Sequence, residues 1–266
     1  MLDPHTALAA ASRPLPRTAG APRLVLLIGG GGNLGAAVLE RLLAEHRFER
    51  IGVLADAALN PAVKRLQPLA LADVAGFGAD TALVVFDRER HANGRDAAFH
   101  RPDPAALLTL AAQCQAAGVQ TLVVVVPHSA ALMPAALSAG LASMDEAAVA
   151  ALGLAQLVFM RTARPGIAAD GQALNAPQRL AAWMLSQLHW LVPQREQPVG
   201  SATVARTAVA VALLLRAAPG ESHTRVLAPA WLWHAAQASD AAALEALLQR
   251  WQSGQPPPLG ATRQRW

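Results

Sequence analysis

The fold is decided by residues 24–46, which read LVLLIGGGGNLGAAVLERLLAEH. The apolar run Leu24–Ile28 is typical of a strand buried on both faces, and the leucines after the glycines recur at helical spacing. We therefore predict a strand over residues 24–28 and a helix over residues 36–46. The four consecutive glycines between them indicate a sharp turn in which the backbone approaches another group closely.

Three glycines of this turn, Gly29, Gly32 and Gly35, have the spacing G-x-x-G-x-x-G of a dinucleotide-binding turn. The first lets the chain turn off the strand, the second lets a diphosphate approach the backbone, and the third lets the helix pack closely on the sheet. The amides of Asn33 and Leu34 are then expected to donate to the phosphates at the positive end of the helix dipole. The alternative is a glycine-rich turn that binds no ligand.

An acidic residue, Asp56, follows the second apolar run and lies 21 residues after Gly35. A carboxylate at this place accepts hydrogen bonds from a ribose 2′-hydroxyl and repels a 2′-phosphate, which favours NAD slightly over NADP. The alternative is a solvated aspartate in a loop. Lys64 and Arg65 lie a little further along the chain and could reach a phosphate, so NADP stays an alternative cofactor.

Short apolar runs alternate with helical periodicity along the rest of the chain. We predict further strands over residues 50–54, 69–74, 82–86, 121–126, 157–160 and 224–227. We predict further helices over residues 104–117, with Asp103 as N-cap and Gly118 as the end, and over residues 138–152, 176–191, 201–216 and 241–251. This alternation is typical of the α/β class, as a doubly wound, Rossmann-like parallel sheet with helices on both faces.

The chain of 266 residues is expected to form a single domain over residues 22–252. Residues 1–21 are rich in proline and are expected to be a disordered leader, and residues 253–266 a flexible tail. Within the domain, residues from about 165 to 235 are expected to form an elaborated C-terminal cap beside the sheet.

Composition excludes several classes of protein. The net charge is +4 and no window holds a dense basic run, so we expect no nucleic-acid partner. No segment reaches about 18 uninterrupted apolar residues, so we expect no membrane span and a cytoplasmic protein. The lone cysteine, Cys114, excludes an intrachain disulfide and a multi-cysteine zinc site, and its apolar helical setting predicts a buried packing residue.

The chain resembles the short-chain dehydrogenase/reductase superfamily, and more narrowly its atypical branch, which contains the nitrogen-repression regulators. The resemblance spans about residues 22–235. It is carried by LIGGGGNLG at the turn, ERIGVL at the second strand, AAQCQAAGVQTLVVVV and LAQLVFMRTARPG. It implies a Rossmann-like fold that binds NAD or NADP.

Members of this superfamily carry a serine after the fifth strand and Tyr-x-x-x-Lys on the next helix, where the tyrosine is the acid or base. This chain has no tyrosine, and its only lysine is Lys64. By spacing, Gly140 and Met144 would occupy the tyrosine and lysine positions, and neither exchanges a proton. The usual hydride-transfer mechanism therefore cannot operate, whereas glycines and backbone amides would still bind a diphosphate.

Two residues after the fifth strand, His128 and Ser129, are weak catalytic candidates. Histidine titrates near neutral pH and could act as a general base, although a polar loop residue is the simpler interpretation. Asp87 and the charged residues 88–90 are expected to form solvated ion pairs. Asp145 and Glu146 are expected at the surface or at a helix cap.

Arg161 is expected in a structural ion pair. The spacing of His91, His100 and Asp103 fits no compact metal site. In WLWH, residues 231–234, the tryptophans indicate a packed edge or a partner surface.

These features leave three hypotheses. The first is a dinucleotide-binding protein without reductase chemistry, acting as a redox sensor or regulator on an unknown small molecule or protein. The second is an NAD(P)H-dependent oxidoreductase or isomerase that uses non-tyrosine chemistry, and the third is a Rossmann-like scaffold without a ligand. A homodimer through the alanine-rich helices at 103–117 and 138–152 is left open.

Overall fold

One sheet of seven parallel strands runs through the part of the chain that the structure, a computed structural model, describes: residues 23–59, 63–87, 96–128, 144–163, 199–216 and 223–258. The strand order is β3-β2-β1-β4-β5-β6-β7. The strands are β1 (Leu24–Ile28), β2 (Arg50–Leu54), β3 (Leu66–Leu69), β4 (Thr81–Val85), β5 (Thr121–His128), β6 (Gln156–Ala163) and β7 (His223–Leu227). The chain builds outward from β1 in one direction and then returns to add β4 on its other side, which is the doubly wound Rossmann order. The predicted fold class is confirmed.

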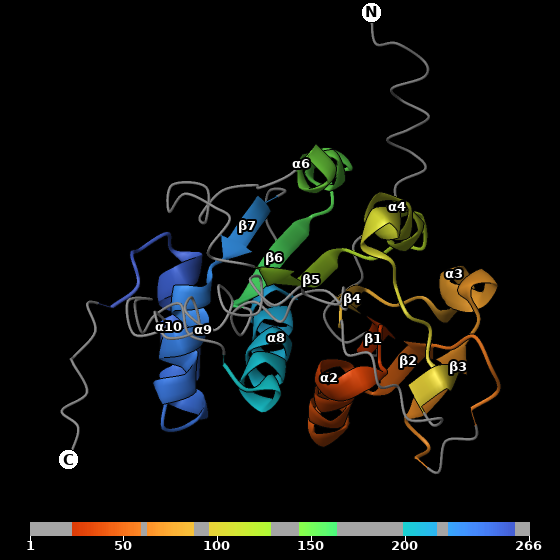
Figure 1. Ribbon diagram of the computed structural model, residues 1–266, viewed down its shortest axis with the longest axis horizontal. Coiled ribbons are helices and arrows are strands. Elements are labelled where there is room, and N and C mark those ends of the chain that lie inside the picture. The colour runs from red at the N-terminus through yellow and green to blue at the C-terminus, as the bar shows by residue number, and fades with distance from the viewer. Residues whose placement is uncertain are drawn as a thin grey trace, which may run out of the picture.

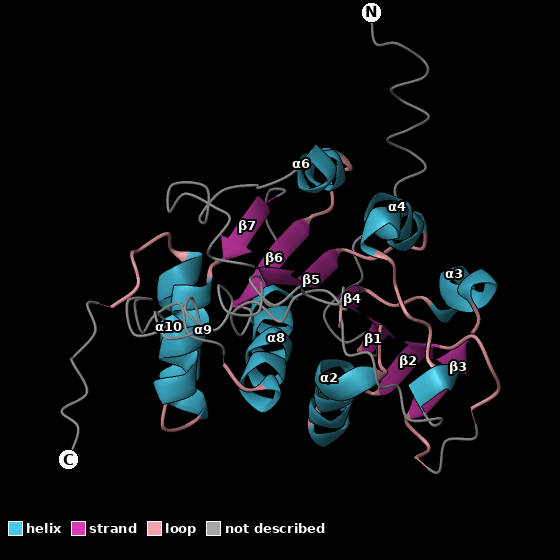
Figure 2. Cartoon of the chain, viewed as in Figure 1, coloured by secondary structure: helices cyan, strands magenta, loops and turns pink. Residues whose placement is uncertain are grey.

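Helices cover both faces of this sheet (Figures 1 and 2). On one face lie α2 (Gly32–Ala44), α8 (Ser201–Arg216), α9 (Pro229–Gln237) and α10 (Ala241–Gln252). On the other lie α3 (Val74–Phe77), α4 (Leu107–Ala116) and α6 (Met144–Ala151). In the connections that the structure describes lie the short 3₁₀ turns η1 (Leu71–Asp73), η2 (Asp96–Ala98) and η3 (Pro104–Ala106).

Two hydrophobic cores result from the alternation of side chains along each strand. In β1, Val25 and Leu27 belong to the core under α2 and α8, whereas Leu26 and Ile28 belong to the core under α3 and α4. Because both faces are covered, β1 and β4 are buried along their whole length and consist almost entirely of apolar residues, which is why the sequence reveals them as continuous runs.

Cys114 is buried in the second of these cores. Burial raises the pKa of its thiol to about 12, so the group stays neutral and packs as a small apolar side chain. The prediction of a packing residue is confirmed.

Several predicted elements agree closely with the structure, including the first two strands and the helix over residues 201–216. Asp103 caps η3 by accepting from the amide of Ala105 at 3.0 Å, and Gly118 follows α4 with φ +88°. The predicted strand over residues 69–74 is wrong, since β3 lies at Leu66–Leu69 and is followed by η1 and α3. This edge strand is half-buried and contains a proline, so it lacks the apolar signature of the central strands.

Helix α2 begins at Gly32, four residues before the predicted start at residue 36. Helix α9 was not predicted, and it carries the WLWH stretch, with Trp231 buried against the first core. The predicted helix over residues 176–191 lies outside the described residues.

The segment from about 165 to 235 was expected to form a cap beside the sheet. Of this segment the structure describes residues 199–216 and 223–235. There, α8 packs on the sheet next to α2, and β7 is the last strand of the sheet itself. These two elements therefore belong to the sheet and to the helical layer that covers it, and not to a cap beside the sheet. Residues 164–198 lie outside the described part.

Among the described residues, no helix has the length and apolar character needed to cross a membrane.

Candidate functional site

The turn between β1 and α2 is built from glycines that leave no room for a side chain. Gly29 has φ +87°, and a Cβ there would collide with the carbonyl oxygen of Val85 at the end of β4. A Cβ on Gly35 would collide with the carbonyl oxygen of Gly29. Both obstacles are backbone atoms, which cannot move aside as a flexible side chain can. These two glycines are therefore required by the turn itself, with or without a ligand.

Gly32 differs from these two, because its neighbour is a side chain. It has φ +74°, and a Cβ there would lie 2.7 Å from Oδ2 of Asp87. The same Oδ2 atom accepts a hydrogen bond of 2.7 Å from the backbone amide of Leu34, in the first turn of α2. The carboxylate of Asp87 thus lies where the sequence predicted a phosphate.

The position of Asp87 corrects the expectation of a solvated ion pair. Asp87 is half-buried and follows β4, and β4 pairs with β1, so the residue reaches the turn that leaves β1. Helix α2 offers no local substitute, since its N-cap is Gly31 and its first turn contains no acid. The positive end of the helix dipole and the amide of Leu34, which has no acceptor one turn earlier in the helix, both favour an anion here. Residues 88–90 lie outside the described part.

Residues 96–102, which we call the covering segment, lie against the same turn. The ring of Phe99 is 3.2 Å from the place of a Cβ on Gly30, and the carbonyl oxygen of Asp96 is 3.1 Å from that of Gly31. Pro102 lies 3.2 Å from the corresponding place on Gly29. The outer side of the glycine turn is therefore packed against protein.

The covering segment also pairs with the residues after β2. The amide of Asp56 donates to the carbonyl of Ala98 at 2.9 Å, and the amide of His100 donates to the carbonyl of Leu54 at 2.9 Å. Ala55 and Phe99 form an isolated antiparallel bridge. The covering segment is thus fixed to the carboxyl end of β2 by backbone hydrogen bonds.

Asp56 lies where the sequence placed it, just beyond the carboxyl end of β2. Its side chain is 61% exposed, and its Oδ1 atom is 2.8 Å from Nδ1 of His100. Such a carboxylate can accept from a ribose hydroxyl only beside, or in place of, this histidine. Its role toward a ribose remains a prediction.

Arg65, which the sequence left open as a contact for a phosphate, does not reach this edge. It precedes β3, so it lies at the amino edge of the sheet, opposite the glycine turn. Its guanidinium donates to the carbonyls of Phe48 at 3.0 Å, Glu45 at 3.3 Å, and Leu43. It therefore satisfies carbonyls at and beyond the C-terminal end of α2. Lys64 lies beside it at that edge and is exposed.

The structure describes the catalytic candidates only in part. His128 ends β5 and pairs in register with Ala163 at the end of β6, which places its backbone at the carboxyl edge. The side chain of His128, together with Ser129 and Gly140, lies outside what the structure describes. Met144, at the lysine position of the resembling family, begins α6 and is 86% exposed.

A buried ion pair joins α6 to β6. Oε2 of Glu146 accepts from Nη2 of Arg161 at 2.8 Å, and the side chains are only 9% and 2% exposed. The structural pairing of Arg161 is confirmed, whereas the surface or cap position expected for Glu146 is wrong. The two residues are 15 positions apart on separate elements, so no local pattern announces the pair.

The described residues contain no group of three or more histidine, cysteine or acidic side chains that could hold a metal ion. A groove of about 330 Å³ lies between α2, α8 and α10, away from the glycine turn. Its charged lining is balanced: Arg41, Arg47, Arg206, Glu45, Asp240 and Glu245. Arg47 donates to Glu45 at 2.9 Å and lowers the pKa of that carboxyl, so part of this charge is already neutralised. The glycine turn remains the stronger candidate site.

The comparisons with known proteins find only distantly similar solved structures. No family model matches the sequence, and no curated protein matches it. A Bordetella bronchiseptica enzyme, WbmG, in complex with NAD, is 16% identical, with a TM-score of 0.39 over 80% of this chain and 86% of the other. A UDP-glucose 4-epimerase from Brucella ovis, in complex with NAD, is 16% identical, with a TM-score of 0.42 over 77% of each chain.

A short-chain dehydrogenase from Leptospira borgpetersenii with bound NAD⁺ is 10% identical, with a TM-score of 0.45 over 79% of this chain and 92% of the other. All three likenesses are remote, so the fold assignment rests on the strand order of this chain itself.

Proposed function

We propose that this chain binds NAD or NADP at the turn between β1 and α2, without the hydride-transfer chemistry of the reductases it resembles, and acts as a redox sensor or regulator. The proposal is carried by one observation: the glycine turn opens at the point where the strand order of the doubly wound sheet reverses. Ligands of open α/β sheets bind outside the carboxyl ends of the strands at such a point.

The residues present fit most of a dinucleotide. The amides at the start of α2, at Asn33 and Leu34, would hold the diphosphate, and Asp56 after β2 would accept from the adenosine ribose. When bound, the nicotinamide ring supplies a reversible acceptor for hydride. One residue does not fit as it stands, since the carboxylate of Asp87 lies beside the amide of Leu34.

The absence of turnover follows from the missing proton donor. The chain has no tyrosine, and its single lysine, Lys64, lies at the amino edge of the sheet. Methionine at position 144 has no exchangeable proton. A protein with these features would bind the cofactor without a group to protonate a carbonyl or to deprotonate a hydroxyl, which suits a sensor of the dinucleotide pool.

A second candidate function is a scaffold that binds no dinucleotide. It is favoured by the hydrogen bond between Leu34 and Asp87, which satisfies the helix from within the chain. On this interpretation Gly32 is needed to make room for Asp87 rather than for a phosphate.

Titration calorimetry with NAD, NADH, NADP and NADPH separates these functions. We expect binding, with no oxidation of NADH over a panel of carbonyl compounds and quinones. Asp56→Asn should weaken NAD binding by about tenfold, roughly 1.4 kcal/mol, and should not weaken NADP binding, because the carboxylate that repels a 2′-phosphate is gone. Asp240→Asn, at the N-cap of α10, is the matched control and should bind as the wild type does.

Two results would contradict the proposal. Rapid oxidation of NADH with any member of the panel would restore a catalytic role. Failure of all four dinucleotides to bind at millimolar concentration, both in the wild type and in the Asp87 variants described below, would favour the scaffold.

A further inference from the structure

We infer that Asp87 is an internal competitor for the diphosphate site: its carboxylate must leave the N-terminus of α2 before a dinucleotide binds there. The inference rests on the proposed function, and it identifies a regulatory contact within the same site. It starts from the carboxylate that lies where the diphosphate is expected.

The geometry gives both anions the same donor. The amide of Leu34 donates to Oδ2 of Asp87 at 2.7 Å, which is a short, charge-assisted hydrogen bond. The carboxylate also lies against Gly32, in the space that the missing side chain leaves for a phosphate. A carboxylate and a phosphate within a few ångströms of each other repel strongly in a half-buried site. One of them therefore has to be absent when the other is bound.

Asp87 competes effectively with a dinucleotide because its carboxylate is covalently attached to the chain beside the site. Asp87 lies two residues after the end of β4, and β4 is hydrogen-bonded to β1 along its length. A tethered group has an effective concentration of millimolar or more at a site within its reach. A dinucleotide from solution has to overcome that concentration before it binds, so the apparent affinity falls.

Hydrogen bonds hold the backbone around Asp87 in place. Arg101 of the covering segment donates to the carbonyl oxygen of Asp87 at 3.4 Å. The amide of Phe86 donates to the carbonyl of Val125 at 3.1 Å, which continues the pairing of β4 with β5. Displacement is therefore a rotation about the side-chain bonds of Asp87 and does not require the end of β4 to move.

Removal of the charge at position 87 tests the inference. Asp87→Asn keeps the shape and an oxygen acceptor without the charge, and Asp87→Ala removes the group. By calorimetry, both variants should bind NAD at least tenfold more tightly than the wild type, and the control Asp240→Asn should match the wild type. Near-ultraviolet circular dichroism checks that each variant is folded.

Inorganic pyrophosphate is a second probe, since it carries the two phosphates without the nucleosides. It should raise the melting temperature of Asp87→Ala more than that of the wild type, because the vacated amide of Leu34 can donate a hydrogen bond to the anion.

The outcomes separate this inference from the proposed function. If the wild type binds NAD and the variants bind it equally or more weakly, Asp87 is no competitor and the inference is overturned, while dinucleotide binding stands. If pyrophosphate stabilises Asp87→Ala selectively but no dinucleotide binds to any variant, the competition is supported and the proposed function fails. If neither probe binds to any folded variant, both are overturned.

Discussion

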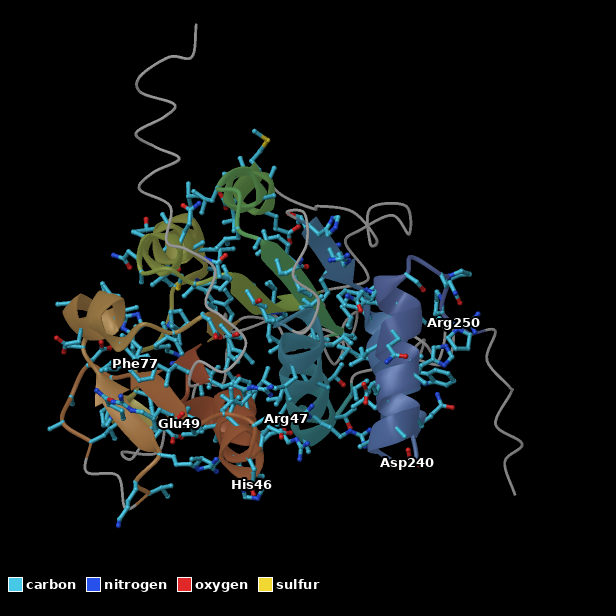
Figure 3. All side chains as sticks on the ribbon, turned by 180° about the vertical axis from the view of Figure 1, so that it is seen from behind. His46, Arg47, Glu49, Phe77, Asp240 and Arg250 are labelled. Atoms are coloured by element: carbon cyan, nitrogen blue, oxygen red, sulfur yellow. The ribbon has the colours of Figure 1, made fainter. Side chains whose placement is uncertain are left out.

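Helices α10 and α2 each begin beside a carboxylate, and they obtain it in different ways. Helix α10 follows its own N-cap, Asp240, which lies at the end of the helix (Figure 3). The Asp240 side chain accepts from the amide of Ala243 at 2.8 Å. Helix α2 follows a glycine, Gly31, which has no side chain to offer. Its carboxylate comes from Asp87, 53 residues along the chain from Leu34.

The difference separates a structural cap from a site. A local cap completes a helix with residues that already stand next to it, so nothing else is needed there. A helix that begins in glycines has backbone donors open to any anion that fits, and the fold decides which anion arrives. In this chain the parallel pairing of β1 with β4 brings Asp87 to that place.

The largest expected effect is at Gly35, on which the start of α2 depends. A Cβ there meets the carbonyl oxygen and carbon of the preceding turn, so Gly35→Ala should lower the free energy of unfolding by about 4 kcal/mol or more. Urea denaturation measures the loss. Gly76→Ala is the matched control, because no atom lies within 4 Å of its added methyl group. Equal stability of the two variants would show that the turn can relax.

A third acid, Glu146, tests what determines the contribution of an acid to the free energy of unfolding: its position in the first turn of a helix, or its ion-pair partner. It lies in the first turn of α6, but it is turned inward to Arg161. Glu146→Ala leaves the buried guanidinium without this carboxylate and should cost about 3 kcal/mol. Asp145→Ala, in the same turn but exposed, should change the free energy of unfolding by less than about 0.5 kcal/mol. A similar loss in both would indicate that the helix dipole dominates.

Asp87 is expected to have a smaller effect on stability than on binding. Without a ligand, Asp87→Ala removes the acceptor of the Leu34 amide and should lower the free energy of unfolding by about 1 kcal/mol. Millimolar pyrophosphate should restore this loss in the variant and leave the wild type nearly unchanged. If the loss persists at saturating pyrophosphate, the carboxylate acts as a structural cap like Asp240.

The smallest effect is expected at Asp240. The amide of Ala243 lowers the pKa of this carboxyl below its ordinary value of 3.8. A lowered pKa in the folded state stabilises the protein at neutral pH, and the contribution is lost as pH falls below about 3.8. Asp240→Asn keeps an N-cap but should lose slightly less stability than the wild type between pH 6 and pH 3. If urea denaturation shows the same loss of stability with falling pH for the wild type and for Asp240→Asn, then Asp240 does not contribute to the acid dependence.

The sheet could be predicted because its central strands are buried on both faces. Strands β1 and β2 have the predicted limits, since a continuous apolar run leaves little choice of boundary. The edge strand β3 was misplaced, because a half-buried strand with a proline has no such run. Helix α9 was missed, since its nine residues are too few to show a clear helical period.

The site could be predicted only as far as local sequence determines it. The glycines and the first turn of α2 lie in one short stretch, so their arrangement is visible in the sequence. The contact between Leu34 and Asp87, and the pair Glu146–Arg161, depend on which strands are neighbours and on how single side chains rotate. The position of Arg65 depends likewise on the edge of the sheet at which β3 begins.

The unequal lengths of the strands shape the carboxyl edge. Strands β5 and β6 have eight residues each, whereas their outer neighbours β4 and β7 have five. The last three residue pairs, from Val126–Arg161 to His128–Ala163, extend past the ladders on both sides. At about 3.3 Å per residue, this ribbon rises about 10 Å above its neighbours. A molecule lying across the glycine turn would thus meet a wall of paired backbone on its β5 side, and its orientation would be limited by strand length as well as by loops.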